Sequence, residues 1–292
     1  MSKPIPTDRS ESVFEDYKTE YDANQAVVEA NRCLYCSDAP CMKICPTHID
    51  VSEFIRKIAT GNIKGSARTI FDSNILGMSC ARVCPVEVLC VGDCVLNGMG
   101  VPPVQIGKLQ RFATDRAFEN GWRFFEAGEP TGKSVGLVGA GPASLAAAHE
   151  LRRAGHACTI YEKRPVSGGL NTTGIAPYKM RADRSVAEAE WVLAIGGIEI
   201  RTDVEVGKSI SFDERLKKHD AVFVGVGLGP DTRLGVPGED LEGVQGAVAL
   251  IERMKLGKLP LAAVKSALVI GGGNTAIDGV RELLGLGVPK VT

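Results

Sequence analysis

The residues most clearly suited to chemistry in this sequence are cysteines. Eight of the nine lie between Cys33 and Cys94, and only Cys158 stands apart, in an apolar segment where we expect a small buried hydrophobe. In a reducing compartment, closely spaced cysteines bind metal or carry out redox chemistry more often than they form disulfides. They form two groups, Cys33-x2-Cys36-x4-Cys41-x3-Cys45-Pro46 and Cys80-x3-Cys84-Pro85-x4-Cys90-x3-Cys94.

The cysteine–proline pairs favour iron–sulfur clusters over zinc. In two-cluster bacterial ferredoxins, three close cysteines hold one [4Fe–4S] cluster, and the cysteine before proline ligates the other cluster. By that pattern Cys33, Cys36 and Cys41 hold one cluster, and Cys45 helps to hold a second. A pair of zinc sites is the alternative, and Cys33-x2-Cys36 would suit it. The second group, however, has no Cys-x2-Cys knuckle, so the spacing favours iron and sulfur.

A glycine-rich turn between residues 139 and 144 predicts a nucleotide site. It follows an apolar predicted strand and opens an alanine-rich predicted helix. The first glycine makes the tight turn, the second lets the backbone approach a pyrophosphate, and the helix N-terminus supplies amide donors. Glu162 lies 21 residues after Gly141, where an acid binds the ribose 2′-hydroxyl. The residues expected to contact this nucleotide are Gly139, Ala140, Gly141, Pro142, Ala143, Ser144 and Glu162.

A second glycine turn, over residues 271–276, also follows an apolar segment and fits Gly-x-Gly-x-x-Ala. An ordinary turn is the alternative, because this strand–helix unit is incomplete. The side chain that chooses between NAD and NADP would lie beyond Thr292, so that choice stays open. The chain stops a few residues into a further predicted strand at Lys290 and Val291, and we expect it to be part of a longer polypeptide. The expected nucleotide contacts are Gly271, Gly273, Asn274 and Thr275.

Helices are expected to position the cysteines. Apolar residues recur at three- and four-residue spacing in the segments 26–36, 52–74 and 106–122, which is the helical period. Asp50 or Ser52 could cap the second of these helices. The sequence therefore predicts an all-α region up to about residue 120.

After a glycine- and proline-containing linker at 120–133, the pattern changes to alternating strands and helices. Residues 134–163 read as one strand–helix–strand unit, and 220–227 as a later strand. The charged stretch 212–220 predicts a solvated helix. The fold class expected is therefore α/β with an N-terminal all-α domain.

Composition and charge exclude further classes of function. The chain of 292 residues carries 34 Lys and Arg against 35 Asp and Glu, a formal net charge of -1. Such balance gives no overall electrostatic reason to bind nucleic acid or an anionic membrane. No apolar run reaches the roughly 18 residues of a membrane helix, and the N-terminal residues are polar and charged, unlike a signal peptide. We expect a cytoplasmic protein.

Taken together, these motifs resemble a known family. Two cysteine groups, Gly139-Ala140-Gly141-Pro142-Ala143, Glu162 with Gly168-Gly169-Leu170, and a second glycine turn are similar to the flavin and iron–sulfur module of the NAD(P)H-dependent glutamate synthase small subunit. They are equally similar to the N-terminal half of dihydropyrimidine dehydrogenase and its bacterial flavin subunit. The resemblance implies three domains: 1–130 with two [4Fe–4S] clusters, 131–235 with a Rossmann-like fold for FAD, and 236–292 as a truncated, Rossmann-like NAD(P)H-binding domain.

The resemblance also implies how the ligands are divided. One cluster takes Cys33, Cys36, Cys41 and Cys94, and the other takes Cys45, Cys84 and Cys90. In dihydropyrimidine dehydrogenases the eighth ligand is a glutamine in a segment like 106–110, which implies Gln110. Spacing alone would choose Cys80, because thiolate is the usual ligand of an iron–sulfur cluster. We favour Gln110 and keep Cys80 as the alternative.

Around the FAD, the resemblance places the segment from Glu162 to Leu170 and a basic residue matching Lys179. Ala176 is an extra residue relative to the family's Gly-Ile-Pro pattern, and it precedes the expected flavin contact of Lys179. The C-terminal portion that normally completes both nucleotide sites lies beyond this sequence. The further residues expected to contact the flavin nucleotide are Gly168, Gly169, Leu170, Lys179 and Val206.

The function implied is electron entry. NAD(P)H, either NADH or NADPH, would give a hydride to FAD, and the two clusters would relay single electrons to a partner subunit in a hetero-oligomer. No catalytic side chain is expected, because the cofactors carry the chemistry. Gln110 and the Gly-Pro-Ala-Ser turn favour an FMN-containing, pyrimidine-reducing partner over the large subunit of glutamate synthase. A non-catalytic iron–sulfur or zinc scaffold that only binds nucleotide is the alternative from another class.

Overall fold

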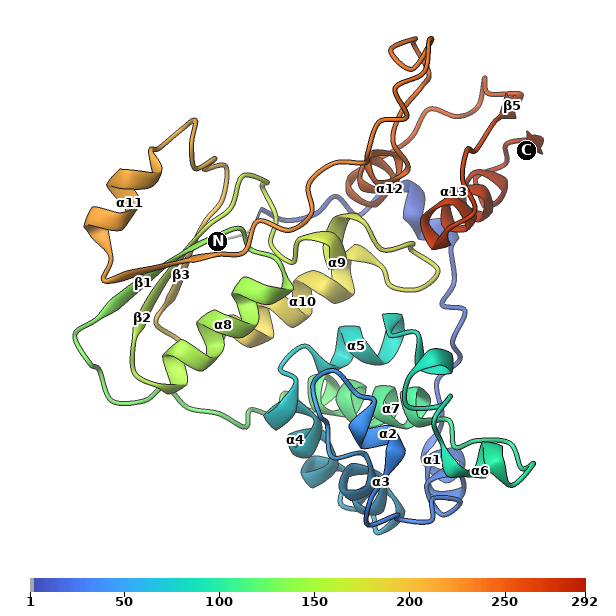
Figure 1. Cartoon of the computed structure of the whole chain (residues 1–292), viewed down its shortest axis with the longest axis vertical. Helices are drawn as coiled ribbons and strands as arrows, with labels where there is room; N and C mark the ends of the chain where they lie inside the picture. Colours follow the sequence, from blue (N-terminus) through green and yellow to red (C-terminus); the bar gives the residue numbers. More distant parts are fainter. Residues whose placement is uncertain (1–2) are drawn as a thin grey trace. The chain divides into compact units, whose positions relative to one another are not determined.

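The computed structural model describes residues 3–292, apart from the side chains at 215 and 216, and it divides into two compact units (Figure 1). The helical unit comprises residues 18–126. The sheet unit comprises residues 127–292 together with the segment up to Tyr17. The three domains expected from the resemblance are a finer division, and their boundaries stay a prediction.

The helical unit is built from short helices whose ends are set by polar caps. Asp22 and Gln25 form a capping box at the start of α1. The Asp50 carboxylate accepts a hydrogen bond from the Glu53 amide at 2.9 Å, so Asp50 rather than Ser52 caps α3. The helices are α1 (Ala23–Ala30), α2 (Pro40–Lys43), α3 (Val51–Ala59), α4 (Ile63–Ser73), α5 (Gly77–Val83), α6 (Val95–Gly98) and α7 (Ile106–Glu119), with a 3-10 turn at Val86–Val88.

Two details of the expected helices are wrong. The helix expected over 52–74 is two helices, because Gly61 adopts a positive φ of 78° and Asn62 caps α4 through the Gly65 amide. The helix expected over 26–36 ends at Ala30, and the chain through Cys33 and Cys36 is a loop.

The core of the helical unit lies between α3, α4 and α7, which pack on one another. Their apolar residues repeat at helical spacing, so each helix turns one buried face inward. A further pair, α5 and α7, packs together and carries residues of the second cysteine group and its neighbours. The fully or almost fully buried residues include Phe54, Ile55, Ile58, Ile70, Phe71, Leu109 and Ala113.

The sheet unit contains a four-stranded parallel sheet of strand order β3-β2-β1-β4. Val135 pairs with Cys158 on one side and with Ala221 on the other, which places β1 in the interior. Helix α8 packs on β1 and β2, and α10 packs on α8 (Figure 1). This confirms the predicted α/β class. The elements are β1 (Ser134–Val138), α8 (Pro142–Arg153), β2 (Ala157–Tyr161), α9 (Leu170–Thr173), α10 (Ala182–Leu193), β3 (Ile198–Arg201), α11 (Phe212–Lys218) and β4 (Ala221–Val224), after a 3-10 turn at Ser10–Val13.

The C-terminal part of the sheet unit is a smaller strand–helix–strand arrangement. Strand β5 (Ser266–Ala267) pairs in parallel with β6 (Lys290–Val291), and α12 (Ala247–Leu256) and α13 (Asn274–Gly285) pack together beside them. The expected strand at 290–291 is present, whereas the apolar segment before the second glycine turn forms a strand of only two residues. Within residues 3–292, no helix has the length and apolar character needed to cross a membrane.

Candidate functional site

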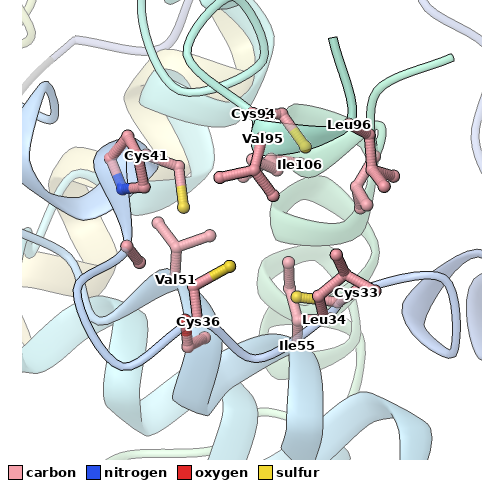
Figure 2. A pocket seen from close by; sticks show the side chains of 14 residues that line it. Cys33, Leu34, Cys36, Cys41, Val51, Ile55, Cys94, Val95, Leu96 and Ile106 are labelled. Carbon is pink, nitrogen blue, oxygen red and sulfur yellow. The ribbon is translucent and has the colours of Figure 1, made fainter. Parts of the chain in front are cut away.

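Four cysteines line one hollow in the helical unit. Cys33 and Cys36 come from the loop after α1, Cys41 from α2, and Cys94 from the residue that caps α6. Figure 2 shows their sulfur atoms pointing toward a common centre. Apolar side chains also line the hollow, among them those of Val51, Ile55, Val104 and Ile106. The structure thus brings the compact triplet together with a cysteine more than fifty residues further along the chain.

The surroundings of these cysteines fit a cationic group. Burial raises the pKa of the Cys33 thiol, and it raises the pKa of Cys41 to about 12, with nearby thiolates adding repulsion. Thiolates gathered in an apolar hollow need a positive partner, and metal supplies one by displacing the protons. Tyr35, at a positive φ of 50°, turns the loop between Cys33 and Cys36.

A second hollow is lined by Cys45, Cys80, Cys84, Cys90 and Gln110. Burial raises the pKa of Cys90 to about 12, and a hydrogen bond from Cys80 is the main cause that lowers the pKa of Cys84. As the side chains stand in the described part of the chain, no three Cys, His, Asp or Glu residues meet closely enough to hold a single metal ion. Each hollow nevertheless collects four sulfur donors, the soft ligands that iron–sulfur clusters use.

The two candidates for the eighth ligand face the same hollow. Cys80 on α5 lies one helical turn before Cys84, as its spacing predicts. Gln110 on α7 is buried, and its Nε2 donates to the Gly77 carbonyl at 2.8 Å, so its Oε1 is the atom left to act as an acceptor or ligand. The choice between Cys80 and Gln110 stays a prediction.

In the sheet unit, the first glycine turn connects β1 to α8. Gly139 has a φ of 90°, and a Cβ on it would lie 2.5 Å from the Gly225 carbonyl oxygen, so the fold itself requires glycine there. Gly141 is different: it caps α8 at a φ of -79°, and a Cβ would meet only the Gly169 Cα, at 3.9 Å. The protein leaves open the space beside Gly141, as a pyrophosphate site needs.

Glu162 ties this turn together. Its Oε2 accepts a hydrogen bond from the Ala140 amide at 2.7 Å, and its Oε1 accepts one from the Arg164 amide at 2.8 Å. The carboxylate is almost fully buried. Sequence reasoning gave Glu162 a ribose contact and missed this backbone role, because a sequence motif does not show which amides a side chain will reach.

The second glycine pair packs onto the first turn. The Gly168 amide donates to the Ala140 carbonyl at 2.8 Å, and a Cβ on Gly169 would lie 2.7 Å from the Gly141 Cα. Ser144 is fully buried, and a Cβ on Gly225 would collide with its hydroxyl at 2.2 Å. These close approaches place the two glycine-containing segments expected to contact the flavin, at 139–144 and 168–170, next to each other.

The remaining expected contacts lie elsewhere in the sheet unit. Lys179 forms an ion pair with Asp278 of α13 at 2.8 Å, and the Tyr178 hydroxyl donates to the same carboxylate. Val206 sits in an isolated β-bridge with Ile210. At the second turn, Gly273 caps α13, and a Cβ on it would meet nothing within 4 Å. A flavin contact of Lys179 or Val206 stays a prediction.

The fold and the site define a class of protein. A helical unit with two hollows, each lined by four cysteines, in the same chain as a parallel nucleotide-binding sheet is typical of an iron–sulfur oxidoreductase. Residues 133–292 match the family model of the pyridine nucleotide-disulphide oxidoreductases, and the chain belongs to this family. Residues 9–122 match the model described as dihydropyrimidine dehydrogenase domain II, 4Fe-4S cluster. These matches confirm the resemblance seen in the sequence.

Individual relatives match the chain over most of its length. The chain is 39% identical over 268 residues to the NAD-dependent dihydropyrimidine dehydrogenase subunit PreT of Escherichia coli K12, covering 91% of this chain and 64% of PreT. It is 35% identical over 301 residues to the glutamate synthase [NADPH] small chain of the same organism, covering 99% of this chain and 63% of that protein. The chain therefore spans just under two thirds of the length of these relatives.

Solved structures also show similarity to the chain. Mycobacterium tuberculosis FprA in complex with NADPH is 29% identical, with a TM-score of 0.44, and the match covers 52% of this chain and 36% of FprA.

Proposed function

We propose that the chain is an electron-entry module, which takes electrons from NAD(P)H and delivers them through FAD and two [4Fe–4S] clusters to a partner subunit. The observation that carries this proposal is the gathering of Cys33, Cys36, Cys41 and Cys94 around one hollow, in a chain whose other unit is a nucleotide-binding sheet. When bound, the flavin would supply hydride chemistry and the clusters single-electron transfer.

The helical unit would hold the clusters through side chains. Cys33, Cys36, Cys41 and Cys94 bind the first, and the apolar wall behind them keeps water from the sulfur atoms. The second cluster takes Cys45, Cys84, Cys90 and, as the eighth ligand of the pair, Gln110. Cys80 then packs beside Cys84 as a hydrogen-bond donor.

The sheet unit would hold nucleotides through its main chain. The amides at the start of α8 bind the FAD pyrophosphate, and Gly141 leaves it room. Glu162 fixes the turn at Ala140, and its remaining lone pairs accept a hydrogen bond from a ribose hydroxyl. The turn before α13 binds the NAD(P)H pyrophosphate in the same way, and the open space beside Gly273 supports this assignment.

A hetero-oligomer with an FMN-containing, pyrimidine-reducing subunit is the assembly we favour. The support is the higher identity to a dihydropyrimidine dehydrogenase subunit and the presence of Gln110 in the second hollow. The large subunit of glutamate synthase is the second candidate, supported by the similarity to a glutamate synthase small chain. NAD(P)H-driven turnover after mixing with each partner subunit, with a pyrimidine or with glutamine and 2-oxoglutarate, separates the two.

The module itself is tested on the anaerobically purified chain. Iron and acid-labile sulfide in equal amounts, four of each per cluster, together with bound FAD, are expected. Visible absorbance of the flavin and clusters should bleach on addition of NADH or NADPH. Zinc in place of iron and sulfide, or nucleotide binding with no bleaching, would replace the proposal with the non-catalytic scaffold.

A further inference from the structure

A buried lysine from outside the flavin segment holds that segment in place. Lys255, on α12, is fully buried. Its Nζ donates to three main-chain carbonyls: those of Met180 at 2.7 Å, Ile175 at 2.8 Å and Asn171 at 3.3 Å. An ammonium group has three donors, so Lys255 uses its whole capacity on the stretch that follows Gly169.

We propose that Lys255 is a positioning residue for flavin binding, which acts by fixing the chain from Gly168 to Met180. The inference rests on the proposed function, in which this segment faces the FAD. The link to the binding site is direct in the chain: Gly169 packs on Gly141, and α9 begins at Leu170, the next residue. The carbonyls that Lys255 binds lie within α9 and in the loop after it.

Electrostatics explains why the side chain is an amine. Burial lowers the pKa of Lys255 to about 8, and the carboxylates of Glu11, Glu282 and Asp183 oppose this shift, whereas Arg9 adds to it. A buried ammonium is costly unless every donor is paired, and here three carbonyls pair it. Apolar residues would leave those carbonyls unsatisfied, and glutamine offers only two donors.

The same segment is held at its far end by other elements. Lys179 and Tyr178 are bound to Asp278 of α13. Glu11, fully buried, accepts hydrogen bonds from the Ala182 amide at 3.1 and 3.2 Å. Among these anchors Lys255 alone reaches both α9 and the loop after it, so its loss should free the part nearest the glycine turn.

The test uses the full chain with Lys255→Met, a replacement of similar length without donors. We expect FAD affinity to fall about tenfold, because a loop that adopts its binding-competent conformation only about a tenth of the time binds about ten times more weakly. Lys255→Gln, with two donors, should fall in between. Iron and sulfide content should not change. The control is Lys258→Met, three residues after Lys255 in the chain. Lys258 is exposed and paired with Asp8, so this variant should bind FAD as the parent does.

Amide hydrogen exchange of the flavin-free chain supplies the second readout. Lys255→Met should speed exchange within residues 168–180 and leave β1 and β2 as protected as in the parent. A role in general stability would instead lower protection throughout the sheet unit and leave the FAD affinity of the folded protein unchanged. If Lys255→Met does not fold, Lys255→Gln carries the same comparison.

The outcomes separate the two proposals. Parent-like FAD affinity and parent-like exchange in the two Lys255 variants would overturn the positioning role while leaving the flavin site standing. No FAD binding to the parent chain, with faster exchange in Lys255→Met, would remove the proposed flavin function and with it the role of Lys255 in flavin binding.

Discussion

The helical unit and the sheet unit build their sites from different parts of the chain. In the helical unit the atoms proposed to be functional are side-chain sulfurs, and their cysteines are half-buried. In the sheet unit they are main-chain amides, and the close approaches and open space around them depend on the lack of a side chain at Gly139, Gly141 and Gly169. A substitution in the first unit therefore removes a ligand, whereas a substitution in the second adds an obstacle.

The two units also differ in how they treat buried charge. In the helical unit Arg82 is paired with Asp115 at 2.8 Å, and Arg111 shares the same carboxylate at 3.2 Å. In the sheet unit Glu282 is fully buried, and neither of its carboxylate oxygens has a hydrogen-bond partner in the described structure. Each of these arginines therefore has a carboxylate partner, although Arg82 Nε has no hydrogen-bond partner in the described structure, whereas the Glu282 carboxyl has no hydrogen-bond partner there and is costly to ionise.

The largest effect is expected from Cys41→Ser in the helical unit. A cubane cluster needs all its ligands, and serine offers a harder oxygen in place of thiolate, so one cluster should be lost completely. Iron and acid-labile sulfide per chain should fall by half. Cys158→Ala, which changes the cysteine outside both groups, should leave both contents unchanged. Full iron and sulfide in Cys41→Ser would break the assignment of the first hollow.

The second largest effect is expected in the sheet unit, from Gly141→Val. The valine side chain would occupy the space left for the pyrophosphate, and losing two hydrogen bonds to a charged group costs about 3 kcal/mol, roughly a 100-fold loss of FAD affinity. Fluorescence titration with FAD measures it. Gly98→Val, at an exposed glycine with open space around it, is the matched control. Parent-like affinity in Gly141→Val would show that the turn does not approach the ligand.

The difference between the units also decides what the sequence could predict. Residue spacing predicted the cysteine groups and the strand–turn–helix at Gly139, because both depend on local pattern. It placed Cys33 and Cys36 on a helix, since helical periodicity does not register the turn at Tyr35. Gathering Cys94 with Cys41 took the family resemblance, because contacts across fifty residues leave no local trace.

The buried lysine of the sheet unit shows a second limit. In a sequence, Lys255 reads as a solvated residue, because lysine is seldom fully buried. Only the fold reveals that three carbonyls surround its ammonium group. Likewise, the bond between Glu162 and Ala140 depends on the sheet bringing the ends of β1 and β2 together.

A smaller effect is expected at the second hollow, where the family resemblance favours Gln110 and the spacing favours Cys80. If Gln110 is the ligand, Cys80→Ser keeps both clusters and an unchanged EPR signal on reduction. Gln110→Cys also keeps both clusters, but it shifts one midpoint potential downward, because a thiolate adds negative charge to the cluster's shell. Loss of a cluster in Cys80→Ser, with none lost in Gln110→Ala, would give the position to Cys80 and weaken the case for a pyrimidine-reducing partner.

The smallest effect concerns the unpartnered carboxyl of Glu282 in the sheet unit. Burial, with Asp278 adding repulsion, raises its pKa from 4.5 to about 8, although Lys255 and Lys179 work against the shift. The folded state therefore holds this proton more tightly than the unfolded state does. The stability it contributes is fully present below about pH 4.5 and is lost as the pH rises to about 8.

Glu282→Gln keeps the shape of the side chain and removes this titration. The thermal midpoint of the variant should therefore match the parent's near pH 4.5 and exceed it by a few degrees near pH 8, when both are measured without FAD. Glu242→Gln, at an exposed glutamate, should show no such divergence. A constant difference between Glu282→Gln and the parent across this range would mean that Glu282 is charged in the folded protein. Glu282 would then be a carboxylate supported by Lys255 and Lys179, and the sheet unit would pair its buried charge with opposite charge, as the helical unit pairs Arg82 and Arg111 with Asp115.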